Sequence, residues 1–122
     1  MQIYEVWAGE KRVLARCESG DSPLFRYKGL LGRSFLMADE GILLPHCNSI
    51  HMFFMKFPID AIFLDKGKKI VRICHGIKPW RISPLVWSAD AVLETAAGVC
   101  RRCSLSEGDI LEFNKNADNQ NA

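Results

Sequence analysis

The sequence lacks a strong excess of charge of either sign. Its 122 residues carry 16 lysine and arginine side chains against 14 aspartate and glutamate side chains, so the formal net charge at pH 7 is only +2. A charge this small creates little field to attract a polyanion, whether a nucleic acid or an acidic membrane surface. The composition therefore predicts neither a nucleic acid nor a membrane as a partner.

Targeting and phosphate-binding motifs are missing as well. The segment Met1–Trp7 carries an acidic residue, Glu5, and no basic leader followed by an apolar run, so we expect a cytoplasmic protein without a secretory signal. Lys56 and Asp60 interrupt the longest apolar stretch, which falls short of the roughly 20 residues that span a bilayer. The chain also has no glycine-rich phosphate loop and no Gly-x-Ser-x-Gly nucleophile elbow.

Paired cysteines of the kind found in secreted domains are not indicated. The five cysteines are an odd number in a chain with no export signal, which favours free thiols over a disulfide framework. They are Cys17, Cys47, Cys74, Cys100 and Cys103.

The composition that is present indicates one globular domain. A chain of 122 residues that is 48% hydrophobic is close to the commonest domain size and can bury a single core. No large apolar residue follows Phe113, and the remaining residues are mainly amides and charged groups. We therefore predict a domain over residues 1–113 and a polar disordered tail over residues 114–122.

The local patterns predict a mainly β domain of the α+β class, with antiparallel strands in a barrel-like or rolled sheet and one or two short helices. A helix is expected over Ser22–Leu31, with a proline in its first turn and apolar residues at helical spacing. A short helical turn is expected over Cys100–Ser104. The expected strands are Ile3–Trp7, Val13–Glu18, Glu40–Pro45, Ile59–Leu64, Ile70–Cys74, Asp90–Thr95 and Ile110–Phe113.

The densest apolar stretch runs from Ile50 to Asp65. Its first part has apolar residues at helical spacing, but Pro58 disfavours the helical region for the residue before it, so we predict a strand over Ile50–Met55. The later segment Gly76–Val86 is rich in proline and tryptophan and is expected to be an irregular loop covering an opening of the β structure.

The motifs in this order resemble the family called domain of unknown function 192. The matching residues extend over nearly all of the predicted globular part. They are Arg26 with Gly29-Leu30-Leu31, Gly41-Ile42-Leu43-Leu44, Ile50-His51 with Phe54-Met55-Lys56, Pro58-Ile59-Asp60 with Ile62-Phe63-Leu64-Asp65, Val92-Leu93-Glu94 with Ala97-Gly98, and Gly108-Asp109. The resemblance implies a compact, barrel-like antiparallel β fold, and it implies no established activity.

Two carboxylates stand inside hydrophobic strand patterns. Asp60 and Glu94 must each be paired, hydrogen-bonded or shifted in pKa if they are buried. Either one is a candidate general acid or base, together with His51. The competing expectation is structural, with backbone amides or the cations Lys56 and Arg72 as partners.

The histidines and cysteines offer two further hypotheses. His46, Cys47 and His51 with the later cysteine pair have the chemistry of metal ligands, but their spacing is not that of a structural zinc site, so we predict no metal. Cys100-Arg101-Arg102-Cys103 at an expected helix start is a candidate redox pair, because a helix dipole and guanidinium groups lower a thiol pKa. The surroundings of the pair, which lack a thioredoxin-like βαβ unit, favour two inert thiols.

The function that these patterns favour is a non-catalytic module that binds a ligand or a protein, without a cofactor. A hydrolase-like, redox or metal protein that uses His51, Asp60 and Glu94, or the cysteine pair, is the alternative. The oligomeric state stays open. Candidate binding residues are His51, Met55, Lys56, Asp60, Trp80 and Glu94.

Overall fold

A computed structural model describes residues 2–20, 33–53 and 55–116 of the chain. The helix expected over Ser22–Leu31 lies outside these residues. In the described part, the architecture is mainly β, as predicted, with one short helix. No helix in that part is long and apolar enough to cross a membrane.

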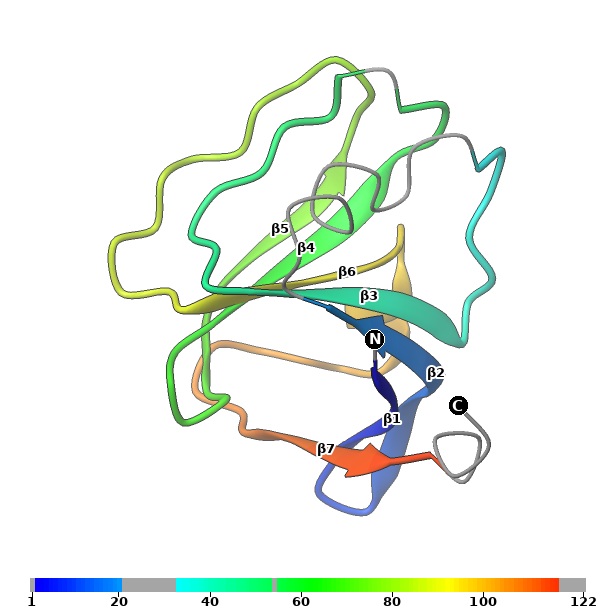
Figure 1. Cartoon of the computed structure of the whole chain (residues 1–122), viewed down its shortest axis with the longest axis vertical. Helices are drawn as coiled ribbons and strands as arrows, with labels where there is room; N and C mark the ends of the chain where they lie inside the picture. The colour runs from blue at the N-terminus through cyan, green and yellow to red at the C-terminus, as the bar shows by residue number, and fades with distance from the viewer. Residues whose placement is uncertain (1, 21–32, 54, 117–122) are drawn as a thin grey trace.

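Within the described residues, seven strands form one sheet in the order β5-β4-β6-β3-β2-β1-β7 (Figure 1). All neighbouring strands run antiparallel except β2 and β3, which are parallel. The elements are β1 (Gln2–Ala8), β2 (Lys11–Ser19), β3 (Glu40–Pro45), β4 (Ile59–Leu64), β5 (Ile70–Ile77), β6 (Ala91–Ala96), α2 (Val99–Arg102) and β7 (Leu111–Lys115).

The sheet is rolled, so that its two edge strands meet at one end. The N–H of Ile70 donates to the carbonyl of Asp109 at 2.8 Å, and the N–H of Leu111 donates to the carbonyl of Lys68 at 3.0 Å. A single bridge between Lys69 and Ile110 joins the edges there. No continuous ladder connects β5 with β7 in the described part, so the fold is barrel-like without being a closed barrel.

The sheet is covered by apolar side chains on both faces. The inner cluster fills the roll and draws on every strand, with Leu14, Ile62, Leu93 and Leu111 among its members. The outer cluster packs between strands β3, β4 and β6 and the loops that cross them. Its members are Leu36, Ile42, Leu44, Ile50, Met52, Met55, Ile59, Ala61, Phe63 and Val92. Strand β4, which lies between β5 and β6, is buried along its whole length, because its alternate side chains point to different faces of the sheet.

The strand predicted over Ile50–Met55 is wrong. Its described residues, 50–53 and 55, form a loop that makes one isolated bridge, between His51 and Ile82. Ile50, Met52 and Met55 are buried, and His51 and Phe53 are exposed. The apolar residues of the segment therefore anchor a loop on the outer cluster and do not belong to a ladder of backbone pairs.

The other boundaries shift by a few residues. Strand β5 extends to Ile77, so the irregular segment begins later than the predicted start at Gly76. The helical turn α2 begins at Val99, one residue before the predicted position. Strand β7 runs to Lys115, and the N–H of Asn116 donates to the carbonyl of Ile3, so the first residues expected in a disordered tail are paired with β1. Residues 117–122 lie outside the described part.

Gly41 in β3 occupies a position with no room for a side chain. A Cβ atom there would lie 2.6 Å from Cδ1 of Leu14 and 2.9 Å from the backbone oxygen of Glu94. Gly41→Ala is therefore expected to lower the free energy of unfolding by about 1–3 kcal/mol through overpacking, measured by urea denaturation. Gly67→Ala is the control, because its Cβ would meet only Asp65 Oδ1, at 3.5 Å. Equal losses in the two variants would contradict the prediction.

Candidate functional site

Asp60 is a buried carboxylate on β4 that faces the interior of the roll. Its neighbours Ile59 and Ala61 both belong to the outer cluster, so its own side chain points to the opposite face. The side chain is held by three backbone donors. Oδ1 accepts a hydrogen bond from the N–H of Gly76 at 2.8 Å, and Oδ2 accepts from the N–H groups of Gly98 and Cys100, each at 3.1 Å. Backbone amides are thus its partners, as the structural expectation predicted.

A β-bulge places two residues of β5 opposite Asp60. The pairing register between β4 and β5 shifts at this point, so that His75 and Gly76 together face the single residue Asp60. Gly76 has a φ of 59°, which a side chain rarely adopts. Bulges of this kind re-aim backbone and side-chain groups. Here the bulge turns the Gly76 N–H toward the carboxylate.

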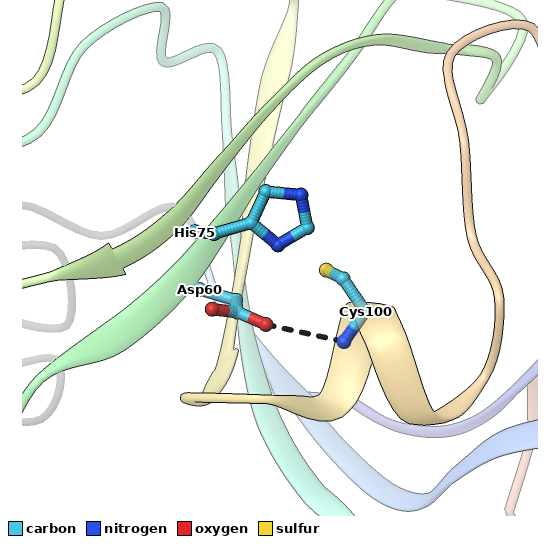
Figure 2. A group of neighbouring side chains, drawn as sticks. All are labelled: Asp60, His75 and Cys100. Atoms are coloured by element: carbon cyan, nitrogen blue, oxygen red, sulfur yellow. Dashed lines mark hydrogen bonds between the residues drawn. The ribbon is translucent and has the colours of Figure 1, made fainter.

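The helical turn α2 brings Cys100 to the same carboxylate. The N-cap residue of α2 is Gly98, which has a φ of 96°. Glycine has no side chain that could accept hydrogen bonds from the free N–H groups at the start of the helix. The carboxylate of Asp60 on β4 accepts hydrogen bonds there instead. Figure 2 shows the result, in which the side chains of Asp60, His75 and Cys100 converge from β4, β5 and α2. One ligand atom from each lies within 4.8 Å of the others.

The environment of Cys100 raises the pKa of its thiol. Burial is the main cause, and the negative charge of Asp60 adds to it. The expectation that the helix start and two guanidinium groups would lower this pKa is therefore wrong for Cys100. Cys103 is also buried, and both thiols are free. Two inert thiols remain the prediction for the pair, and a redox role remains the alternative hypothesis.

Glu94 lies on the other face of the sheet from Asp60. It pairs in register with Ala61 of β4, and both side chains therefore point toward the outer cluster. The residue is 7% exposed, and burial raises the pKa of its carboxyl from 4.5 to about 7. The sheet itself separates the two carboxylates, so Asp60 and Glu94 do not act on one group from a common cleft.

His51 belongs to a group of exposed, mainly aromatic side chains on two loops. Its ring lies 4.9 Å from the ring of Phe53, which in turn lies 6.1 Å from the ring of Trp80. His51 also bridges to Ile82 across the two loops. We call these four residues, His51, Phe53, Trp80 and Ile82, the aromatic face. Trp80 is 59% exposed and Ile82 is 67% exposed.

Two long loops hold the aromatic face in place. The segments 46–53 and 78–90 run side by side (Figure 1). The N–H of Met52 donates to the carbonyl of Arg81 at 2.7 Å, and the N–H of Trp80 donates to the carbonyl of Met52 at 2.8 Å. The buried hydroxyl of Ser83 accepts from the N–H of Ile50 at 2.8 Å. Backbone pairing and buried anchors thus fix the loops that carry exposed rings.

The remaining sequence candidates are placed separately. Met55 is buried in the outer cluster, and Lys56 is exposed. His46 lies 3.8 Å from the carboxylate of Asp90, and the Cys47 thiol donates to the carbonyl of Ser49 at 2.9 Å. Among the described residues, His46, Cys47 and His51 form no group with the spacing of a metal site.

His75 was not among the sequence candidates. His75 comes directly after the predicted strand Ile70–Cys74 and belongs to no recognised motif. No spacing in the sequence connects it with Asp60 or Cys100. The signal that could have indicated it is the dipeptide His75-Gly76 at the end of a strand, because glycine inside a strand pattern often marks a bulge. The partner across the bulge depends on strand register, which a single sequence does not contain.

Comparison with known proteins assigns the family. Residues 5–113 match the family named DUF192 and described as "Uncharacterized ACR". The chain belongs to the DUF192 family. The match confirms the resemblance seen in the motifs, and the family has no characterised function.

Curated relatives of this DUF192 domain carry names that state no activity. A UPF0127 protein of Thermococcus gammatolerans is 33% identical over 112 residues, which cover 88% of this chain and 69% of the relative. A UPF0127 protein of Thermococcus sibiricus is 29% identical over 116 residues, which cover 89% of this chain and 69% of the relative.

Two solved structures share the fold of the DUF192 domain. One is a protein of unknown function from Novosphingobium aromaticivorans, with a TM-score of 0.78 and 25% identity over 90% of this chain and 83% of that one. The other, from Sinorhizobium meliloti 1021, is described as a proposed transcription regulator. It has a TM-score of 0.75 and 25% identity over 92% of each chain.

Proposed function

We propose that this DUF192 domain is a non-catalytic interaction module that binds an apolar segment of another protein through the aromatic face. The observation that carries the proposal is the row of neighbouring exposed side chains, Trp80, Phe53, His51 and Ile82, on loops that are themselves fixed by backbone hydrogen bonds. Exposed apolar groups that lie together, unlike single ones, mark interaction sites. Tryptophan is also enriched among the residues that dominate binding energy at interfaces.

The backbone at Trp80 supports a binding role. This residue has a φ of 68°, in the left-handed region that bulky side chains rarely adopt. Such a conformation costs on the order of 1 kcal/mol, yet the side chain it presents is 59% exposed. Strain that places a large ring at the surface is typical of a position selected for what the ring contacts.

The charges near the aromatic face favour a protein partner. Lys78 and Arg81 flank Trp80 in the same loop, and both are exposed. Together with the apolar rings, they suit a segment with apolar side chains next to acidic ones. Two cations and a net charge of +2 offer little to a nucleic acid backbone. The five free thiols favour a reducing compartment, so we place this module in the cytoplasm.

A peptide selection tests the proposal directly. The folded chain is immobilised and a random peptide library is displayed against it, with the Phe53→Ala/Trp80→Ala double variant as the counter-target. Selected peptides are expected to combine aromatic or aliphatic residues with acidic ones. Trp80→Ala should weaken their binding at least about 30-fold, as loss of a central interface side chain does. Isothermal titration calorimetry gives the dissociation constants.

The matched control is Ile110→Ala, which removes a 63% exposed apolar side chain next to β7. This control should bind the selected peptides as the wild type does. Peptides that bind the double variant and the wild type equally would overturn the proposal. Dimers in analytical ultracentrifugation that dissociate in the double variant, without any enriched peptide, would assign the face to a second copy of this chain and also contradict it.

A further inference from the structure

We propose that Asp60, His75 and Cys100 form a binding site for a zinc ion. The three residues offer one oxygen, one nitrogen and one sulfur ligand, and in the described part of the chain they are the group whose ligand atoms gather within 4.8 Å. Carboxylate, imidazole and thiolate are the ligand types that hold zinc in proteins. The site is independent of the aromatic face and of the function proposed for it.

The geometry needs only a small adjustment. Ligand atoms around one tetrahedral zinc ion, at about 2.0–2.3 Å from the metal, lie about 3.4 Å from one another. The present separations of up to 4.8 Å therefore have to contract by up to about 1.4 Å. His75 is exposed and can rotate about its side-chain bonds, whereas Asp60 and Cys100 are buried and fixed. Figure 2 shows the His75 ring directed toward the other two side chains.

The surroundings orient the ligands in advance. Three backbone N–H groups hold the Asp60 carboxylate, and one of them belongs to Cys100 itself. Hydrogen bonds to ligating carboxylates of this kind are a usual feature of metal sites, because they fix the ligand before the ion arrives. The N–H groups of Gly76 in the bulge and of the N-cap residue Gly98 thus find their acceptor in Asp60, and the same hydrogen bonds orient Asp60 for the proposed zinc ion.

Binding of one cation by all three side chains explains their arrangement better than a catalytic role for Cys100 as a nucleophile does. In a catalytic set, the histidine stands between the thiol and the carboxylate so that it can take the thiol proton. Here the carboxylate accepts from the backbone of Cys100 directly, and each of the three groups is close to both others. Zinc binding replaces the thiol proton of Cys100, which passes to solvent. With three protein ligands, the ion keeps one position for water or an anionic ligand.

Metal titration of the full chain tests the site. Protein freed of metal with a chelator is titrated with Zn²⁺ against a chromophoric competitor, and native mass spectrometry counts the bound ions. We expect one zinc ion per chain. His75→Ala should lower the zinc affinity at least about 100-fold, and it should leave the fold intact in circular dichroism because the side chain is exposed. His46→Ala, at another exposed histidine, should change the affinity less than about threefold.

Cobalt identifies the sulfur ligand. Co²⁺ bound at the site should show the visible bands of tetrahedral coordination and a near-ultraviolet band from thiolate-to-metal charge transfer. Cys100→Ala should abolish the charge-transfer band, and Cys103→Ala, at a buried cysteine three residues away, should keep it. The proposal is overturned by a zinc content below about a tenth of an equivalent in excess metal, by equal affinities in His75→Ala and His46→Ala, or by a charge-transfer band that persists without Cys100.

Discussion

Asp60→Ala is expected to lower the free energy of unfolding by about 4 kcal/mol, enough to unfold a marginally stable domain. The variant removes the acceptor of the buried Cys100 N–H and of the partly buried Gly76 and Gly98 N–H groups, and an orphaned buried donor costs about 1–3 kcal/mol. The same change removes the side-chain contacts by which β4 holds the bulge of β5 and the start of α2. Urea denaturation followed by circular dichroism measures the change.

Two further variants, Asp60→Asn and Asp65→Ala, test whether the loss of stability in Asp60→Ala comes from the buried hydrogen bonds of this carboxylate. The asparagine keeps one oxygen but presents an NH₂ group to backbone donors, so an intermediate loss of about 2 kcal/mol is expected. Asp65 also accepts from two backbone N–H groups, those of Gly67 and Lys69, but on a turn that water reaches. Its replacement by alanine should cost less than about 1 kcal/mol. An Asp60→Ala loss no larger than that of Asp65→Ala would contradict the central role of the buried carboxylate.

Glu94→Gln is expected to stabilise the domain at neutral pH and to have little effect near pH 4. Burial raises the pKa of the Glu94 carboxyl from 4.5 to about 7, so the folded state holds its proton more tightly than the unfolded state. Below pH 4.5 the group is protonated in both states and costs nothing. Between pH 4.5 and about 7 the unfolded state ionises first, and stability falls as the pH rises. Above this range the penalty is constant at about 3 kcal/mol.

The measurement is the difference in unfolding free energy between Glu94→Gln and the wild type, from urea titrations between pH 4 and pH 8. The difference should grow by about 3 kcal/mol across the range and then level off. Glu112→Gln, at an exposed carboxylate on β7, is the matched control for the removal of one negative charge. A Glu94→Gln difference that is flat would show that this carboxyl ionises in the folded protein as it does in the unfolded chain.

The strands of this domain could be predicted because their side chains carry the pattern of burial. The pattern of Ile59–Leu64 predicts a strand, which the structure confirms, and backbone amides are one of the two kinds of structural partner predicted for the carboxylate within it. The prediction of a strand from the apolar run at Ile50–Met55 failed, because those apolar residues pack on the outer cluster from a loop. An apolar run indicates which groups are buried, and it does not say whether the backbone has a partner strand.

The composition of the site depended on information that local patterns do not hold. Asp60 and Glu94 look alike in the sequence, as single carboxylates in apolar strands, yet the pairing of Glu94 with Ala61 puts them on opposite faces. His75 joins Asp60 only because β5 carries a bulge at that register. Strand register and bulges arise from the whole sheet, so the grouping of Asp60, His75 and Cys100 could be found only in three dimensions.

The pairing of β1 with β7 has a consequence for how the domain folds. Tyr4 lies opposite Lys115, so β1 obtains its second neighbour only when almost the whole described chain is available. Contacts so distant in sequence slow folding, because a long loop must close before they form. Until Leu111–Lys115 has left the exit tunnel of the ribosome, β1 presents an open edge, and an open strand edge is a site for pairing with other chains.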